Sequence, residues 1–207
     1  VAPDAQGCSG KYLLAIARFI SQCQQAGKEV ILVSSGSVAA GRSLISHGSP
    51  NPSITTKQAM AAVGQMKMMA NWQRFFDVPP CSQLLITHGD LKDRQRYINI
   101  KNTLRILLAN GVIPIVNEND TVATEELKVG DNDNLAALVA LVSEADSLFI
   151  LSDVDGVFSA DPRLNPQAKL IPVIAKIDAS VYAMAGATNN HIATGGMKTK
   201  IQAAEKA

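Results

Sequence analysis

The chain of 207 residues has little net charge, few aromatic residues and few cysteines. Lysine and arginine number 19 against 18 aspartate and glutamate, which leaves a formal net charge of +1. Such a balance creates no extended field that would attract nucleic acid or an acidic membrane surface. A charged ligand must therefore be recognised by a local cluster of side chains, and we expect no nucleic-acid or membrane partner for this portion.

Cysteine usage and the lack of long apolar runs exclude two further classes of protein. Cys8, Cys23 and Cys81 form neither a CxxC pair nor an even framework, a pattern typical of a reducing compartment. The apolar run from Leu135 to Val142 is far too short to span a bilayer, and no basic segment followed by an apolar one marks a leader. We therefore expect a cytoplasmic location.

Two common nucleotide-binding signatures are also missing. The chain has no Gly-x-x-x-x-Gly-Lys-Ser/Thr motif and no GxGxxG after a predicted strand, which disfavours a P-loop NTPase and a Rossmann dehydrogenase. His47, His88 and His191 lie far apart without metal-ligand spacing, and we predict that they are solvated. Ligand binding must depend on other residues.

Hydrophobic periodicity alternates between helical and strand patterns along the chain. We predict helices at 11–26, 38–44, 54–76, 90–109, 134–143 and from 201 onward, and strands at 30–33, 82–87, 112–116 and 147–151. The predicted apolar face of helix 54–76 comprises Met60, Val63, Met66, Met69 and Ala70. Alternating strands and helices imply parallel pairing through right-handed crossovers, and hence an open sheet covered on both faces.

Three polar clusters follow predicted strands. They are Ser-Ser-Gly-Ser at 34–37, Asn-Glu-Asn-Asp at 117–120 and Ser-Asp-Val-Asp-Gly at 152–156. Ligands of open parallel sheets bind beyond the carboxyl ends of the strands, so we expect the three clusters to converge on one edge. The simpler alternatives are a polar turn at 117–120 and an Asx-type turn closing a hairpin at 152–156.

Two further segments place polar residues at the start of a helix. Gly-Asp-Asn-Asp-Asn at 130–134 precedes an apolar helix, whose free N–H groups suit an anion and whose carboxylates suit a metal or an ammonium group. Thr-Gly-Gly-Met-Lys-Thr-Lys at 194–200 is a glycine-rich turn that could cradle phosphate. The alternatives are helix capping by Asp131 or Asp133, worth about 1 kcal/mol, and a flexible loop at 194–200.

Taken together, these segments resemble the amino acid kinase family, and specifically its glutamate-phosphorylating branch. The resemblance runs from about residue 30 to the end and is carried by 33–41, 115–120, 129–135, 151–163 and 194–200. It implies an α/β fold, a three-layer α/β/α sandwich with a mainly parallel open sheet, that uses ATP and Mg²⁺. The implied reaction phosphorylates the side-chain carboxylate of L-glutamate, the first step of proline biosynthesis.

The resemblance also implies roles for residues that match the family pattern. Ser35, Asp120 and Asn132 would bind glutamate, and Asp133 and Lys200 would act in catalysis. The ATP-binding residues would be Ser152, Asp153, Thr194, Gly195, Gly196, Met197, Lys198, Thr199 and Lys200. The resemblance assigns no direct metal ligand.

The family pattern extends beyond this chain and implies partners. Residues 1–207 would form one amino acid kinase domain, without the family's first strand, which bears Lys-x-Gly-Ser/Thr, and without its C-terminal end. Ala193 stands where the family usually has another glycine. The implied partners are another copy of the chain, proline as a feedback inhibitor, and the reductase that forms glutamate semialdehyde from the labile acyl phosphate.

The implied chemistry is electrostatic. A glutamate side chain has a pKa of about 4.3, so the attacking carboxylate is already ionised near neutrality and needs no general base. Asp133 would then organise a lysine or a metal ion, and Asp120 would bind the substrate's ammonium group. Two alternatives stay open: a sibling kinase acting on N-acetylglutamate, aspartate, carbamate or UMP, and a non-catalytic amino-acid sensor of the same fold.

Overall fold

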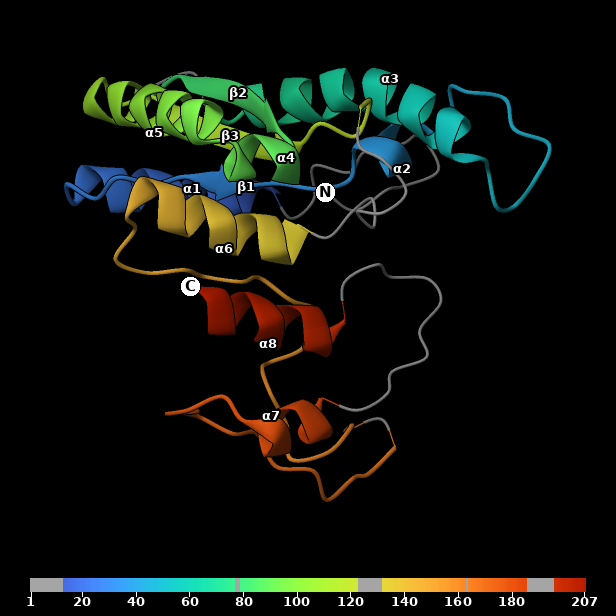
Figure 1. The fold of residues 1–207 in the computed structure, drawn as a ribbon, viewed down its shortest axis with the longest axis vertical. Coiled ribbons are helices and arrows are strands. Elements are labelled where there is room, and N and C mark those ends of the chain that lie inside the picture. Colours follow the sequence, from blue (N-terminus) through green and yellow to red (C-terminus); the bar gives the residue numbers. More distant parts are fainter. Residues whose placement is uncertain (1–12, 77–78, 123–131, 163, 186–195) are drawn as a thin grey trace. The chain divides into compact units, whose positions relative to one another are not determined.

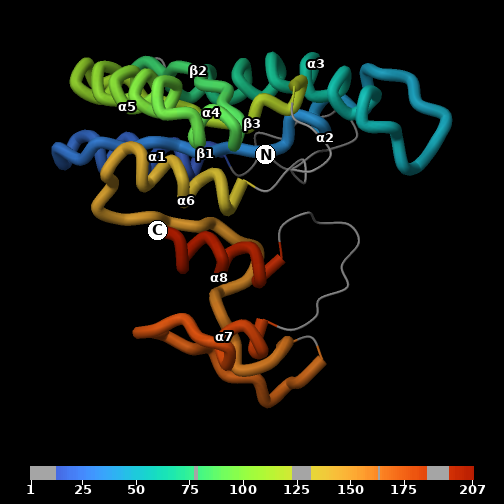
Figure 2. The backbone as a smooth tube through the Cα atoms, viewed as in Figure 1, coloured from blue at the N-terminus to red at the C-terminus, as the bar shows by residue number. Residues whose placement is uncertain are grey.

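A computed structural model describes residues 13–76, 79–122, 132–162, 164–185 and 196–207 (Figures 1 and 2). The chain divides into two compact units, residues 1–130 and residues 131–207. Across the described ranges, no helix combines the length and the apolar character needed to cross a membrane.

The described part of the first unit is a parallel three-stranded sheet with helices packed against it. Its elements are α1 (Leu13–Gln25), β1 (Leu32–Val33), α2 (Ser37–Gly41), α3 (Ile54–Gln73), β2 (Cys81–Ile86), α4 (His88–Lys92), α5 (Arg94–Ala109) and β3 (Ile113–Glu118). The strand order is β1-β3-β2, with Val33 opposite Val116 and Ile86 opposite Glu118. The carboxyl ends of all three strands therefore meet at one edge.

Helices α1 and α3 cover one face of this sheet (Figure 1). They form its core with β3 through Leu13, Ala17, Ile20, Met68, Trp72, Phe76, Ile113 and Ile115. The chain passes from β1 across β3 to β2 through α3, and returns to β3 through α5. Right-handed crossovers in opposite directions place α3 and α5 on opposite faces. The predicted α/β/α sandwich with a mainly parallel open sheet is confirmed.

The predicted apolar face of α3 is partly wrong. Met66 is 77% exposed and Ala70 is also exposed. The buried positions are Met60, Ala61, Gly64, Gln65, Met68 and Trp72. They follow helical spacing, but the buried stripe includes a glycine and a glutamine, which a search for apolar residues cannot detect.

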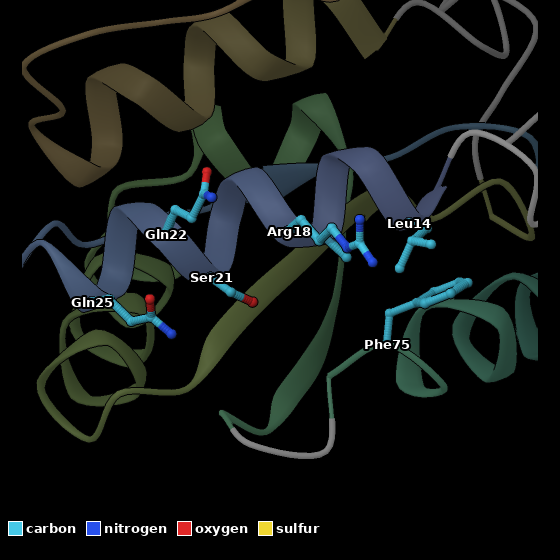
Figure 3. A pocket seen from close by; sticks show the side chains of 7 residues that line it. Leu14, Arg18, Ser21, Gln22, Gln25 and Phe75 are labelled. Carbon is cyan, nitrogen blue, oxygen red and sulfur yellow. The ribbon is translucent and has the colours of Figure 1, made fainter.

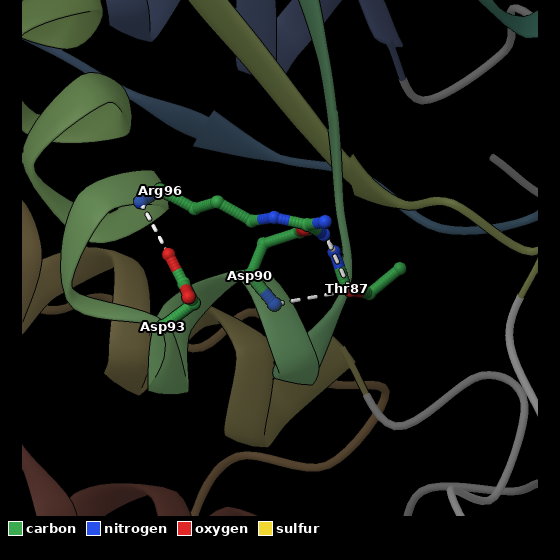
Figure 4. A network of polar contacts seen from close by, with 4 residues as sticks. All are labelled: Thr87, Asp90, Asp93 and Arg96. Carbon is green, nitrogen blue, oxygen red and sulfur yellow. Dashed lines mark hydrogen bonds and ion pairs between the residues drawn. The ribbon is translucent and has the colours of Figure 1, made fainter.

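The helix predicted at 90–109 is two helices, α4 and α5, separated at Asp93. The backbone of Asp93 is extended, and its carboxylate accepts a 2.8 Å hydrogen bond from the Arg96 backbone N–H at the start of α5. Asp90 accepts hydrogen bonds from the backbone and hydroxyl of Thr87, both 2.7 Å, and one of 2.6 Å from the Arg96 guanidinium (Figure 4). These caps favour two helix starts over one continuous helix.

The second unit contains α6 (Asn132–Ser143), α7 (Ala179–Met184) and α8 (Met197–Lys206). Asp178 caps α7 by accepting a 2.8 Å hydrogen bond from the Ser180 backbone. A small core of Val181, Ala185 and Ile201 packs α7 against α8.

The strand predicted at 147–151 is wrong, because the structure assigns no strand to these residues. Phe149 is 75% exposed and Leu151 is 66% exposed. A short antiparallel bridge instead pairs Phe158 with Leu170 further along the chain. An apolar run is compatible with a strand, but a strand forms only where the backbone of a neighbouring segment is placed to pair with it.

Helices α2 and α3 touch through two glycines. A Cβ atom at Gly64 would lie 1.8 Å from the carbonyl oxygen of Ser37, and one at Gly41 would lie 1.9 Å from that of Met60. Both obstacles are backbone atoms, which cannot move aside without shifting a helix. Glycine is therefore needed at both positions, and the contact fixes the start of α2.

We expect Gly64→Ala to lower the free energy of unfolding by about 2–3 kcal/mol, because overpacking must displace one helix. Gly48→Ala is the matched control, since a Cβ there meets nothing within 4 Å. Its effect should stay within about 0.5 kcal/mol. Urea unfolding followed by circular dichroism measures both, and equal stabilities would contradict the close helix contact.

Candidate functional site

Strand β3 ends in two buried polar residues. Asn117 is 2% exposed and Glu118 is 3% exposed. Asn117 Nδ2 donates a 2.9 Å hydrogen bond to Gln65 Oε1 on α3, whereas Glu118 Oε1 lies 3.7 Å from His88 Nδ1 on α4. The alternative of a simple polar turn at 117–120 is therefore wrong for these two residues, which lie inside the strand.

Asp120 follows β3 and is 7% exposed. Its Oδ2 accepts a 2.5 Å hydrogen bond from the Ser37 hydroxyl, while its Oδ1 is buried without a hydrogen-bond partner in the described ranges. Burial raises the pKa of Asp120; the bond from Ser37 acts against this and the charge of Glu118 adds to it, so the pKa lies above its usual value. One carboxylate oxygen is thus held by the protein while the other lacks a donor, which suits a cationic ligand.

The loop after β1 is fixed by α3. The Ser34 hydroxyl accepts a 3.0 Å hydrogen bond from Trp72 Nε1 and lies 3.6 Å from Met68 Sδ. Gly36 then turns the chain into α2 with a φ of 112°, in the left-handed region that favours glycine. Ser34, the buried first residue of this loop, is therefore held in place by α3 before the chain enters α2.

The structure brings 34–37 and 117–120 together, as the sequence predicted for these two clusters. The contact is made by Ser37, however, and not by the predicted substrate-binding residue Ser35, which is exposed on the loop. Ser37 belongs to the predicted cluster 34–37, but the sequence pattern assigns it no role. The local sequence does not distinguish Ser35 from Ser37, because the two serines differ in the direction of their side chains.

His88 does not match the prediction of a solvated histidine. Its side chain is 18% exposed, and its Nδ1 is buried without a hydrogen bond among the described residues. An imidazolium at this position would attract the Glu118 carboxylate across the 3.7 Å separation. The available signal was its position, immediately after a predicted strand that ends at the ligand-binding edge.

In the second unit, the predicted catalytic residues Asp133 and Lys200 contact each other. Lys200 Nζ lies 3.1 Å from both carboxylate oxygens of Asp133, and the Thr199 hydroxyl donates a 2.7 Å hydrogen bond to Oδ2. The two charged side chains are only 16% and 20% exposed. Because Asp133 lies in the first turn of α6 and Lys200 in the first turn of α8, the ion pair joins the two helix starts.

Helix α8 begins earlier than predicted, which changes the setting of the glycine-rich segment. It starts at Met197 instead of 201, and Gly196 is its N-cap residue without a side-chain capping bond. Lys198, Thr199 and Lys200 therefore lie within the first helical turn and not in a loop before it. Thr194 and Gly195 fall outside the described residues.

The remaining described residues of the predicted site are Asn132, Ser152 and Asp153. Asn132 is the first residue of α6. Ser152 and Asp153 are exposed, with the serine hydroxyl 3.5 Å from the aspartate Oδ1. Within the part of the chain that the structure describes, no group of three or more His, Cys, Asp or Glu side chains is placed to hold a metal ion.

In the first unit, a hollow of about 290 Å³ lies along α1 (Figure 3). It is lined by Leu14, Ala17, Arg18, Ser21, Gln22, Gln25 and Phe75. None of the predicted site residues lines it. The buried polar groups of the first unit lie at the strand ends, and the ion pair of the second unit joins the starts of α6 and α8.

A protein-family model described as "Amino acid kinase family" matches residues 1–207. The chain belongs to the amino acid kinase family. Among curated proteins, this kinase-family chain is 56% identical to a glutamate 5-kinase of Idiomarina loihiensis, 56% identical to glutamate 5-kinase 1 of Pseudoalteromonas translucida and 50% identical to a glutamate 5-kinase of Xanthomonas campestris pv. campestris. Each match covers 100% of this chain, but only 56% of the Idiomarina protein, 56% of the Pseudoalteromonas protein and 57% of the Xanthomonas protein. The chain thus spans about half the length of the curated relatives it matches.

We expect Asp120→Asn to raise the stability of the ligand-free amino acid kinase chain at neutral pH. Because the folded pKa of Asp120 lies above its ordinary value, stability is lost as pH rises from the unfolded pKa through the folded pKa. Asparagine carries no charge and avoids this loss. Thermal unfolding across the acidic to neutral range should show a Tm advantage for the variant that grows with pH.

Asp90→Asn is the control of opposite sign. Burial acts to raise the pKa of Asp90, but hydrogen bonds from Thr87 and Arg96 outweigh it and the pKa is lowered. The stabilisation by Asp90 is therefore present above the unfolded pKa and is lost as pH falls through the folded pKa. This variant should be less stable than the parent chain at neutral pH and equal to it in acid; the same pattern in Asp120→Asn would refute the argument for that residue.

Proposed function

We propose that the protein containing this chain transfers a phosphoryl group from ATP to the side-chain carboxylate of L-glutamate, the first step of proline biosynthesis. Asp120 carries this proposal, because its buried Oδ1, which has no hydrogen-bond partner among the described residues, suits the ammonium group of an unmodified amino acid. The relatives named glutamate 5-kinase, 50–56% identical along the whole chain, support the choice of glutamate. The match of one family model to residues 1–207 supports treating them as one kinase domain.

In this proposal the first unit binds the amino acid. Asp120 receives the ammonium group, and Ser37 keeps the carboxylate oriented through its 2.5 Å hydrogen bond. Ser35 is exposed on the neighbouring turn, where its hydroxyl is available to a ligand. Asn132, at the start of α6, supplies an amide to the same substrate by analogy with the family pattern.

The second unit provides the charge that phosphoryl transfer requires. The glutamate carboxylate is already ionised near neutrality, so the chain needs no general base. Lys200 neutralises negative charge that develops on the transferred group, and Asp133 fixes the direction of its ammonium group through two 3.1 Å contacts. The residues proposed to bind ATP are Ser152, Asp153, Thr194, Gly195, Gly196, Met197, Lys198, Thr199 and Lys200.

Mg²⁺ fits this arrangement as an ion bound mainly through the nucleotide. Mg²⁺ is usually held by substrate phosphates and one or two carboxylates, and it would supply positive charge to the phosphoryl group. Asp133, in the first turn of α6, is a carboxylate of the proposed nucleotide half that would hold it. Its contacts with Lys200 and Thr199 would keep the carboxylate in place.

The proposed product also implies partners. A glutamyl phosphate is an acyl phosphate, prone to hydrolysis and cyclisation, so coupling to a reductase that forms glutamate semialdehyde would protect it. We further propose assembly into a homo-oligomer and feedback inhibition by proline, on the strength of the family resemblance. A cytoplasmic location agrees with the free thiols of Cys23 and Cys81.

The full-length protein should phosphorylate L-glutamate and not N-acetyl-L-glutamate. Acetylation removes the positive charge and leaves the buried Asp120 acceptor without a donor, a loss of roughly 1–3 kcal/mol or more. ADP release in a coupled assay measures both reactions. Equal turnover, or turnover only with N-acetylglutamate, aspartate, carbamate or UMP, would point to a sibling kinase, and glutamate binding without turnover would point to a sensor.

Substitutions in the two units should separate binding from chemistry. Lys200→Met and Asp133→Asn should lower kcat by about 10²–10³-fold with little change in the KM for glutamate, because they act on charge that develops in the transition state. Asp120→Asn should chiefly raise the KM for glutamate. Lys169→Ala, an exposed lysine of the same unit as Lys200, is the charge control and should change neither constant. If all the site variants changed only KM, these assignments would be wrong.

A further inference from the structure

Gln65 is a buried polar residue on α3 that has no role in the proposed reaction as described above. It is 7% exposed, and its Oε1 accepts the 2.9 Å hydrogen bond from Asn117 Nδ2. Its Nε2 is buried and has no hydrogen-bond partner among the described residues. A buried N–H donor without an acceptor is costly and rare, so this donor requires an explanation.

Two contacts place Gln65 beside the residues that surround Asp120. The preceding residue, Gly64, packs directly on the Ser37 backbone, since a Cβ there would lie 1.8 Å from the Ser37 carbonyl oxygen. The hydroxyl of the same serine donates to Asp120. The second contact is the hydrogen bond from Asn117, which lies near the end of β3, three residues before Asp120. Gln65 and Asp120 are therefore linked both through Ser37 and through the end of β3.

The two unsatisfied groups have opposite hydrogen-bonding character. Asp120 Oδ1 is a negatively charged acceptor, and Gln65 Nε2 is a neutral donor. A free amino acid carries a cationic donor and an anionic acceptor on the same carbon atom, and it would satisfy both groups at once. The Asn117 bond occupies Oε1 and so fixes which side of the Gln65 carboxamide is available.

We propose that Gln65 is a substrate-binding residue whose Nε2 donates a hydrogen bond to the main-chain carboxylate of the amino acid. This inference rests on the proposed function, in which Asp120 receives the ammonium group of the same molecule. The side-chain carboxylate, which accepts the phosphoryl group, makes no contact with Gln65. The pair selects an amino acid in which the ammonium and its neighbouring carboxylate are both free.

Gln65→Glu tests the donor without removing the bond to Asn117. The variant keeps an oxygen that accepts from Asn117, but replaces the free N–H donor with a second carboxylate oxygen. It should raise the KM for L-glutamate by about 100-fold or more, because a lost hydrogen bond is joined by repulsion between like charges. Gln65→Met, of similar length, should raise it by about tenfold. The kcat and the KM for ATP should change little in both, measured on the full-length protein.

The outcomes distinguish this inference from the proposed function. If the parent protein phosphorylates glutamate but Gln65→Glu has a KM within about twofold of it, Gln65 only positions Asn117 and the inference is overturned. If the KM values for glutamate and ATP rise together, Gln65 acts through packing and the inference is also overturned. Calorimetric titration with L-glutamate needs no turnover: binding without turnover that is lost in Gln65→Glu supports the inference while refuting the reaction, and no binding to the parent protein refutes both.

Discussion

The hydrogen bond from Ser37 to Asp120 depends on how helices α2 and α3 pack, and the amino-acid site proposed in the first unit depends on that bond. Ser37 is the first residue of α2, whose position against α3 is set by the close approach at Gly41 and Gly64. Trp72, further along α3, holds the preceding loop through the Ser34 hydroxyl. A carboxylate as buried as Asp120 needs at least one donor to be tolerated, and this packing supplies it. The helix contact therefore controls both the position and the charge state of the group proposed to bind the substrate.

The two aspartates central to the proposal are in opposite states. Asp133 is hydrogen-bonded by Lys200 and Thr199, so the charges proposed to act on the phosphoryl group are already oriented. Within the described ranges, by contrast, one oxygen of Asp120 and the amide nitrogen of Gln65 have no hydrogen-bond partner. Preorganised charge assists a reaction because nothing has to reorient as charge develops. Unsatisfied buried groups reduce the stability of the ligand-free protein and can be satisfied when a complementary ligand binds.

Predictions from the sequence were accurate where structure follows from local periodicity, and failed where it depends on a cap or a distant partner. The strand predicted at 112–116 is β3, although β3 extends to Glu118 because Asn117 and Glu118 continue the pairing with β2. Helix 90–109 was divided by Asp93, whose capping bond outweighs a continuous helical pattern. The apolar segment 147–151 is not a strand, because its side-chain pattern says nothing about backbone pairing. Gln65 cannot be identified from hydrophobic periodicity, because it is a polar residue on a buried helical stripe.

The alternation of strands and helices, the parallel sheet and the family could all be predicted from the amino-acid sequence. It also identified the segments that carry the polar groups, because these properties depend on the order and spacing of residues along the chain. Which side chain of each segment is buried at the strand ends depends on the folded arrangement: Ser37 donates to Asp120 while Ser35 is exposed, and Gln65 is buried beside Asn117. The physical reason is that side-chain direction is set by helix rotation and strand register against neighbouring elements, which residue spacing alone does not specify.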